Sequence, residues 1–265
     1  MERSDIILLV IDVGNTHMKF GVFEEDKLVH QWVMSTKVEK TSDELGLEIK
    51  SFLISSGFKV EDIEDIVMSS VVPNMLRCVE SACKRYLNKK PYLVTMAKDL
   101  GIVNKYGNKK EVGMDRLVTA SCAYHKYKAP TIVVDLGTAI TVDYINKNGE
   151  YMGGAIAPGI ELSSNALFTG TAKLPKIDLT KPESVIGKTT RESMQSGIVY
   201  GYIGMIDFLI KKILEEENLK VEEVSVIGTG GFAGLISQHS SYINKIDKEL
   251  AMEGLRLIYE RNFKK

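Results

Sequence analysis

Apolar and polar residues follow the same order twice along this chain. The apolar run 6–12 (IILLVID) is followed by residues 17–36, where apolar and polar positions partly alternate around the turn-forming EEDK. In the second half, the run 131–137 (TIVVDLG) is followed by residues 139–159, with a turn predicted at Lys147-Asn148-Gly149. An apolar run predicts a buried strand, and the alternation after it predicts a β-hairpin. The pattern therefore predicts two copies of one three-stranded meander.

Helical spacing follows the first meander. Residues 41–57 repeat apolar side chains at helical intervals, with Thr41 or Ser42 as the expected cap and Gly57 as the expected stop. The rest of this half predicts a short strand, a second amphipathic helix and a further strand, at residues 62–73, 74–87 and 91–95. The second half continues with helix-like segments and a strand, glycine-rich turn and helix at 224–236.

This alternation of strands and helices is typical of the α/β class. Because the second half repeats the order of the first, we expect two related α/β domains facing each other across a cleft. No Pro- or Ser-rich linker separates the halves, so the boundary, near residues 112–130, is expected to be a structural hinge. We assign residues 1–114 to the first domain and 115–265 to the second.

Composition narrows the possible partners. The chain is 44% hydrophobic and 26% charged, as in ordinary globular proteins. A net charge of -1 gives no electrostatic case for a nucleic-acid partner. The first apolar run is broken at Asp12 and is too short for a signal peptide or a membrane span. Three cysteines without CxxC spacing favour reduced thiols, so we expect a cytoplasmic protein.

Each meander carries an Asp-x-Gly turn after its first strand. The glycine lets the backbone turn without a Cβ clash, so that N–H groups and small polar side chains approach phosphate oxygens. Gly14–Thr16 supply these groups in the first copy, with Lys19 as a cationic clamp, and Gly137 and Thr138 supply them in the second. A single copy of so short a pattern indicates only a tight turn. Two copies in matching contexts favour a nucleotide held from both sides.

The two aspartates of these turns need a different partner. A carboxylate repels phosphate, so Asp12 and Asp135 are predicted to bind a metal ion or metal-bound water beneath a polyphosphate. A third glycine-rich turn, at 226–235, admits a base or ribose, or only allows close strand-to-helix packing. It lacks the spacing of a Rossmann fingerprint, and the chain has no Walker A loop.

Six motifs, taken in order, resemble those of the type III pantothenate kinases: DVGNT, GMDR, DLGTAITVD, GGAIAPGIELSSNAL, IGKTTRESMQSGIVYGY and GTGG. That family belongs to the acetate and sugar kinase, Hsp70 and actin superfamily. The resemblance implies two ribonuclease-H-like (actin-like ATPase) domains. It also implies ATP-dependent phosphorylation of pantothenate to 4'-phosphopantothenate, the first step of coenzyme A biosynthesis. A homodimer, Mg2+ and a monovalent cation, K+ or NH4+, are implied with it.

The resemblance also assigns residues to the nucleotide and the cation. Asp135 would bind the monovalent cation and Thr138 the nucleotide. The first loop would hold the ATP phosphates through Asp12, Val13, Gly14, Asn15, Thr16, His17, Met18 and Lys19.

On the acceptor side, the resemblance makes Asp115 the general base on the pantothenate hydroxyl. The substrate contacts that it implies are Tyr106, Gly113, Met114, Asp115, Arg116 and Thr190. Of these, Thr190 would be reached across the dimer interface. The chain departs from the family at Asn108-Lys109, where Asn-Pro is common, so the substrate loop is expected to be less rigid.

Several alternatives stay open. Asp115 is also consistent with a plain first-turn residue of a helix, where the dipole favours an acid. Arg116 either holds the pantothenate carboxylate or pairs with Asp115 and lowers its pKa. The stretch 196–214, with small residues at Gly197, Gly201 and Gly204, packs against a symmetry mate or forms an internal core helix.

Two rival functions are retained. One is a nucleotide-binding transcriptional regulator of the same superfamily without kinase activity. The other is a small-acid or sugar kinase with a different acceptor, which the short chain of 265 residues disfavours.

Overall fold

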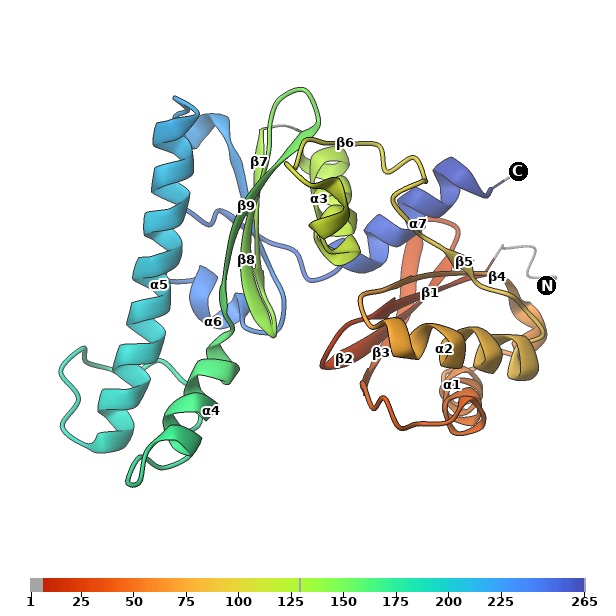
Figure 1. Ribbon diagram of the computed structural model, residues 1–265, viewed down its shortest axis with the longest axis horizontal. Helices are drawn as coiled ribbons and strands as arrows, with labels where there is room; N and C mark the ends of the chain where they lie inside the picture. The colour runs from red at the N-terminus through yellow and green to blue at the C-terminus, as the bar shows by residue number, and fades with distance from the viewer. Residues whose placement is uncertain (1–6, 129, 265) are drawn as a thin grey trace. The chain divides into compact units, whose positions relative to one another are not determined.

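The structure, a computed structural model, describes residues 7–128 and 130–264 and divides into two compact units (Figure 1). The first unit contains residues 7–101, 110–122 and 251–264, and the second contains 102–109 and 123–250 except residue 129. Each unit is built round one sheet. The predicted first strand starts at Ile6, which lies outside the described residues.

The first sheet has five strands in the order β3-β2-β1-β4-β5. They are β1 (Ile7–Val13), β2 (His17–Glu24), β3 (Lys27–Ser35), β4 (Ile63–Ser70) and β5 (Tyr92–Leu93). The first three strands form an antiparallel meander, and β4 and β5 run parallel to β1. The predicted strand, hairpin and two further strands of this half are confirmed.

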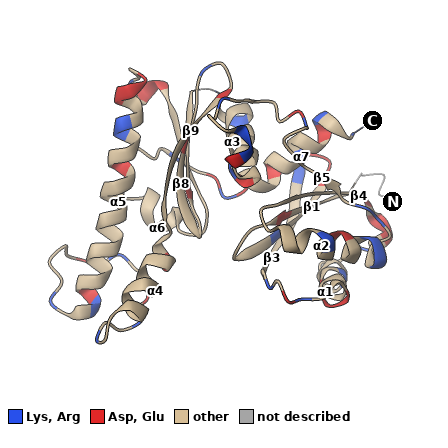
Figure 2. Cartoon of the chain, in the orientation of Figure 1, with Lys and Arg blue, Asp and Glu red and all other residues tan. Residues whose placement is uncertain are grey.

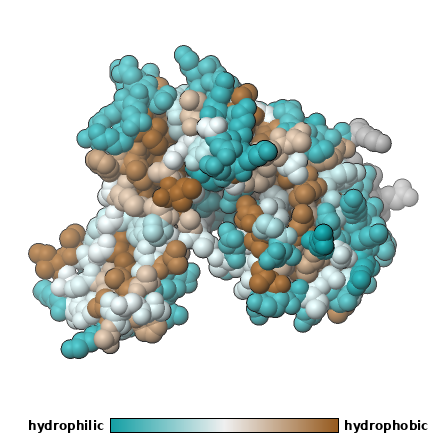
Figure 3. Space-filling model, viewed as in Figure 1, coloured by the Kyte–Doolittle hydropathy of each residue, from teal (hydrophilic) through white to brown (hydrophobic). Residues whose placement is uncertain are grey.

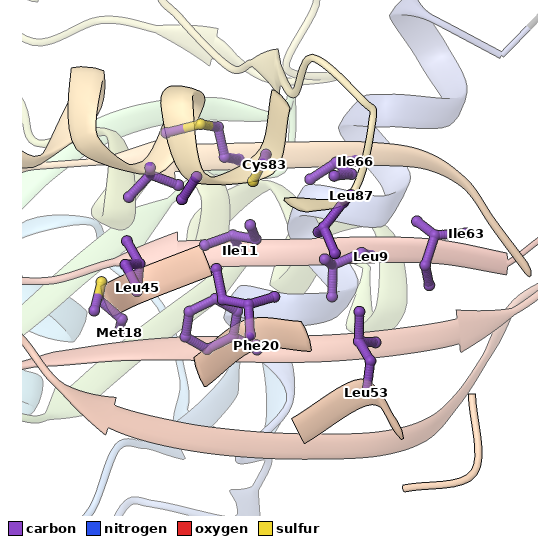
Figure 4. Packing of buried hydrophobic residues seen from close by; sticks show 14 of the residues in the cluster. Leu9, Ile11, Met18, Phe20, Leu45, Leu53, Ile63, Ile66, Cys83 and Leu87 are labelled. Carbon is purple, nitrogen blue, oxygen red and sulfur yellow. The ribbon is translucent and has the colours of Figure 1, made fainter. Parts of the chain in front are cut away.

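One face of this sheet packs against α1 (Ser42–Ser55) and α2 (Pro73–Tyr86). Figure 4 shows Met18 and Phe20 of β2 beside Leu45 of α1 in this cluster. Helix α1 begins with a capping box in which Thr41 and Glu44 bond each other's backbone N–H groups. The predicted cap is thereby confirmed.

The other face of the first sheet meets α7 (Leu250–Asn262). A Cβ at Gly21 of β2 would lie 3.1 Å from the Met252 sulfur, so the helix lies close to the sheet there. A Cβ at Gly254 would lie 2.5 Å from the Val118 carbonyl oxygen of α3 (Met114–Tyr127). The two helices therefore touch through backbone, and the residue at 254 has to be glycine.

The second sheet has six strands in the order β11-β10-β7-β8-β9-β6. They are β6 (Val103–Asn104), β7 (Thr131–Leu136), β8 (Ala139–Ile145), β9 (Glu150–Pro158), β10 (Ser225–Thr229) and β11 (Lys245–Ile246). Without β6, this order repeats that of the first sheet, with an antiparallel meander β7-β8-β9 and parallel β10 and β11. The repeat predicted from the sequence is confirmed, whereas β6 is an addition that it did not predict.

Helices α4 (Ile160–Gly170), α5 (Thr190–Glu216) and α6 (Ala233–Ser237) belong to the second unit. Ile132 and Val134 of β7 pack in one cluster with Ile198 and Ile206 of α5, which is therefore a core helix along one side. Figure 2 shows that the middle of α5, between Glu192 and Asp207, carries no charge. Short 3-10 turns complete the fold at η1 (Val60–Asp62), η2 (Lys109–Glu111) and η3 (Val221–Glu223). None of the described helices, α5 included, is long and apolar enough to cross a membrane.

The compact units do not follow a single cut of the chain. Residues 115–122 and 251–264 pack with the first sheet, and residues 102–109 pack with the second. The sequence-based boundary between 114 and 115 assigns these segments differently, because helical periodicity does not reveal which sheet a helix covers. That boundary stays a prediction about the domains.

Candidate active site

Asp12 lies at the end of β1, between two polar residues of the neighbouring strands. The strand register pairs Asp12 with Lys19 of β2 and with Ser69 of β4. Register partners project to the same face of a sheet, so the three side chains lie side by side. The fully buried Ser69 donates a hydrogen bond from Oγ to Asp12 Oδ1 over 2.7 Å. This trio lies on the face opposite to α1 and α2.

The pKa of Asp12 is raised above the ordinary value of a carboxyl, chiefly because burial disfavours the charged form. The hydrogen bond from Ser69 and the charge of Lys19 act in the opposite direction and lower the pKa. The negative charge of Asp115 raises it further. Asp115 and Asp12 are thus near enough to interact, and the site gathers two carboxylates with one ammonium group.

The loop after Asp12 is a closed turn. The Gly14 N–H donates to the His17 carbonyl at 3.0 Å, and the Thr36 hydroxyl donates to the Gly14 carbonyl at 2.7 Å. A Cβ at Gly14 would lie 2.9 Å from the His17 oxygen, so the turn requires glycine. Asn15, Thr16 and His17 are exposed. The predicted phosphate loop therefore presents small polar groups to solvent.

The eight residues predicted to hold phosphates do not all face one way. Val13 and Met18 are fully buried in the core that α1 and α2 cover. Only their backbone is available to a ligand. Asp12 and Lys19 alternate with them along the strands and project to the opposite face.

The GMDR motif forms the start of α3. Asp115 is exposed in the first turn, where its Oδ1 accepts a hydrogen bond from the Arg116 N–H at 2.8 Å. A Cβ at Gly113 would lie 2.4 Å from the same oxygen, so this carboxylate orientation depends on glycine. Met114 is half-buried and Arg116 is buried. The helix thus fixes Asp115 in the first unit, where it interacts with Asp12.

In the second unit, Asp135 occupies the position that Asp12 has in the first. It ends β7, and its register partners are Thr141 of β8 and Thr229 of β10. A Cβ at Gly230 would lie 2.5 Å from Asp135 Oδ1, and one at Gly137 would lie 3.2 Å from it. Gly230 also has a φ of +90°, which glycine adopts readily. The carboxylate therefore lies against bare backbone.

Three turns meet around Thr138. The Gly159 N–H donates to the Thr138 carbonyl at 3.1 Å, and the Phe232 N–H donates to the Leu136 carbonyl at 3.2 Å. The turns after β7, β9 and β10 are thereby joined, while the Thr138 side chain remains exposed. In the glycine-rich turn, close packing requires glycine at position 230. A Cβ at Gly231, by contrast, would meet no atom within 4 Å.

Two predicted substrate residues lie elsewhere in the second unit. Tyr106 is half-buried, and a Cβ at Gly153 would lie 3.1 Å from its ring. Thr190 is the first residue of α5 and lines an apolar groove of about 660 Å³. Asn108-Lys109 leads into η2, where the Lys109 carbonyl accepts a hydrogen bond from the Asn104 amide at 3.4 Å.

Sequence reasoning missed Ser69. The signal is the Ser69-Ser70 pair that follows the apolar run 66–68 at the end of β4, but its role depends on β4 lying beside β1. Among the described residues, no group of three or more His, Cys, Asp or Glu side chains is placed to hold a metal ion. A Mg2+ ion at Asp12 would take its other ligands from phosphates and water, as Mg2+ commonly does.

Comparison with known proteins identifies the family of this chain. The family model for type III pantothenate kinase matches residues 8–212. A type III pantothenate kinase from Finegoldia magna is 51% identical over 256 residues, covering 97% of this chain and 98% of that protein. The chain belongs to the type III pantothenate kinase family. The family recognised from the motifs is confirmed, and the regulator alternative is not favoured.

Solved structures of low identity share the fold of this kinase. A Sinorhizobium meliloti protein assigned as a 2-dehydro-3-deoxygalactonokinase has a TM-score of 0.63 at 11% identity, covering 96% of both chains. A Campylobacter jejuni protein assigned to the Baf family of transcriptional activators has a TM-score of 0.58 at 19% identity, covering 95% of this chain and 97% of that one. With the repeated strand order, this likeness confirms the predicted pair of ribonuclease-H-like domains.

The raised pKa of Asp12 gives a prediction about stability. Above that pKa the buried charge destabilises the folded state, and the loss disappears as the pH falls and the carboxyl is protonated. Asp12→Asn keeps an acceptor for Ser69 and removes the charge. We expect it to melt a few degrees above the unmodified protein at neutral pH, with the difference shrinking towards about pH 3.

Thermal unfolding followed by circular dichroism between about pH 3 and pH 8 measures this difference. Asp26→Asn, in the exposed β2–β3 turn, is the control and is expected to leave melting unchanged. A lower melting temperature for Asp12→Asn at neutral pH would contradict the prediction, since the attraction of Lys19 would then outweigh the cost of burial.

Proposed function

We propose that this protein transfers the γ-phosphoryl group of ATP to the primary hydroxyl of pantothenate, giving 4'-phosphopantothenate for coenzyme A biosynthesis. Family membership supports the reaction. The observation that carries the assignment of residues is the electrostatic interaction of Asp115 with Asp12 in one unit. A base for an acceptor and a carboxylate for a metal–phosphate complex thus belong to the same local site.

Asp115 acts as the general base. Phosphoryl transfer has a loose transition state, so a carboxylate need only orient the hydroxyl and accept its proton late. The exposed first turn of α3 leaves this carboxylate accessible to an acceptor, and the bond from the Arg116 N–H keeps it oriented. Gly113, Met114 and Arg116 line the pantothenate site beside it.

Lys19 and the Gly14–Thr16 loop hold the ATP phosphates. Lys19 supplies a point charge, and the loop supplies N–H and side-chain donors to phosphate oxygens. Mg2+ bound with the nucleotide would neutralise phosphate charge next to Asp12. Asp12, held by Ser69, orients the water or the cation between itself and the phosphates.

Asp135 binds the monovalent cation and Thr138 contacts the nucleotide. The carboxylate oxygen Oδ1 packs against the backbone of Gly137 and Gly230, so main-chain groups of two turns lie beside it. The Leu136 carbonyl lies 2.7 Å from the Cβ position of Gly230, so a backbone oxygen is available close to the carboxylate. Oxygen ligands of this kind fit K+ and NH4+ in the same place.

The protein acts as a homodimer through α4 and α5. Large apolar side chains are exposed on these helices and on the segment between them, namely Leu162, Phe168, Val185, Ile186 and Phe208. Figure 3 shows apolar surface on this part of the second unit. Cβ atoms at Gly197, Gly201 and Gly204 would meet nothing within 4 Å, so the exposed side of α5 admits the close approach of another helix. Thr190 lines the groove on this face, which suits a contact with the partner's substrate.

The cytoplasm is the expected location. The described cysteines Cys78, Cys83 and Cys122 form no disulfide, as is usual in a reducing compartment. No nucleic acid or membrane enters the proposed reaction.

Turnover tests the acceptor and the base together. We expect ADP release from ATP to require pantothenate, and small sugars and acids in the same assay to give none. Asp115→Asn is expected to lower kcat at least about 100-fold while ATP binding and the circular dichroism spectrum stay unchanged. Asp26→Asn serves as the carboxylate control, and a normal kcat for Asp115→Asn would remove Asp115 as the base.

The cation role of Asp135 predicts a dependence on salt. We expect activity in KCl or NH4Cl and little in NaCl at equal ionic strength, because Na+ holds its water more tightly. Asp135→Asn is expected to reduce the rate in KCl to that in NaCl. Equal rates of the unmodified enzyme in all three salts would show that no such site contributes.

The proposed dimer predicts the effect of a charge on α5. We expect the unmodified protein to have twice the 29.5 kDa mass of the chain, and the Gly201→Glu variant to have the mass of one chain. Light scattering during gel filtration measures both masses. Leu47→Glu, at an exposed apolar position of α1, is the control and is expected to leave the dimer intact. A Gly201→Glu protein that remains dimeric would place the interface elsewhere.

A further inference from the structure

Asp143 is a buried carboxylate with no part in the reaction proposed above. It lies on β8 with only 1% of its surface exposed. Its neighbours Val142 and Tyr144 belong to the core beneath α5, so Asp143 projects from the opposite face of the sheet. Burying a charge is costly unless hydrogen bonds satisfy it. A carboxylate at this position therefore calls for an explanation.

Two hydroxyl groups donate to this carboxylate. Thr141, two residues earlier on the same strand, donates from Oγ1 to Asp143 Oδ2 at 2.7 Å. Tyr151 of β9 donates from its phenol to Asp143 Oδ1 at 2.6 Å. Tyr151 is fully buried, so packing surrounds its ring. The charge-assisted hydrogen bond to Asp143 also fixes its hydroxyl group.

The ring of Tyr151 lies beside that of Tyr106. Their centroids are 6.4 Å apart, and the ring planes are inclined by 38°. The β8–β9 register is irregular next to Tyr151, because Tyr144 pairs with Gly153 while Ile145 pairs with Tyr151. Gly153 has a φ of +110°, and a Cβ there would lie 3.1 Å from the Tyr106 ring. The Tyr106 ring thus packs on the backbone of Gly153, and the Tyr151 ring lies beside it.

The backbone of Tyr106 is fixed separately from its ring. The Lys105 N–H donates to the Tyr151 carbonyl at 2.9 Å, and the Tyr106 N–H donates to the Asn104 side chain at 2.9 Å. Lys105 also pairs with Glu150 at 3.1 Å. Removing the Tyr151 hydroxyl would leave these contacts in place. Its effect would therefore fall on the orientation of the Tyr151 and Tyr106 rings.

We propose that Asp143 and Tyr151 are positioning residues for Tyr106, and that their hydrogen bond sets the ring orientation that pantothenate meets. The inference rests on the proposed contact between Tyr106 and pantothenate. Asp143 anchors the phenol of Tyr151, Tyr151 limits the lateral movement of Tyr106, and Gly153 leaves space under the ring. Loss of the anchor weakens pantothenate binding and leaves ATP binding and the chemical step unaffected.

The first test is Tyr151→Phe in the full-length enzyme with ATP, Mg2+ and K+. We expect KM for pantothenate to rise about five- to tenfold, with kcat and KM for ATP within about twofold of the unmodified enzyme. Tyr144→Phe is the matched control, because Tyr144 is a buried tyrosine of β8 that packs in the core on the other face of the sheet. If the Tyr151 hydroxyl only stabilised the fold, both variants would melt at a lower temperature. Their KM values for pantothenate would then be the same.

A double-mutant cycle tests whether Tyr151 acts through Tyr106. In a Tyr106→Ala background, we expect Tyr151→Phe to have no further effect on KM for pantothenate. An equal effect in both backgrounds would overturn the proposal. If Tyr106→Ala itself leaves KM unchanged while pantothenate turnover persists, the contact and the positioning role both fall, and the kinase assignment stands. Absence of pantothenate turnover in the unmodified enzyme would instead reject the proposed function.

Discussion

A carboxylate at the end of a central, buried strand has to be satisfied by its neighbours, and both sheets are built round such a residue. β1 is flanked by β2 and β4, and β7 is flanked by β8 and β10. Asp12 consequently has Lys19 on one side and Ser69 on the other, and Asp135 has Thr141 and Thr229. In each sheet the parallel neighbour contributes a hydroxyl-bearing residue. The strand order, and not the loop alone, thus determines the environment of each acid.

Much of this arrangement could be predicted from the sequence, because its determinants are local. The capping box of Thr41 and Glu44, the turn at Gly149 and the apolar runs all act within a few residues. A single Asp-x-Gly pattern indicates only a tight turn. Its repetition in two matching contexts favours a nucleotide-binding site. The motif order then identified the family, since several short signals at fixed spacing are far more specific than one.

Other features were beyond local reasoning because they depend on pairing between distant segments. The two-residue strand β6 has no periodicity of its own and exists only because it pairs with Glu150 and Tyr151 of β9. The close contact of α7 with α3 depends on Gly254, which in sequence is just a glycine inside a helix. Ser69 and Asp143 are similar cases, since each is bonded to a side chain on a neighbouring strand. Ser69 bonds Asp12, and Asp143 bonds Tyr151. A single sequence gives no register between strands.

The two acids differ in their surroundings, and the difference bears on what each one binds. Asp12 has an ammonium group beside it and a second carboxylate nearby, which suits a site where phosphate charge and a small hydrated cation are balanced together. Asp135 Oδ1 instead packs against the backbone of Gly137 and Gly230, with the Leu136 carbonyl close by. Its register partner Thr141 also bonds Asp143, which anchors Tyr151 beside Tyr106. One face of the second sheet therefore carries a continuous row of polar side chains from Asp135 to Tyr151. Thr141 of β8 thus lies in register with Asp135, the proposed cation ligand, and donates to Asp143, the proposed anchor of the tyrosine pair.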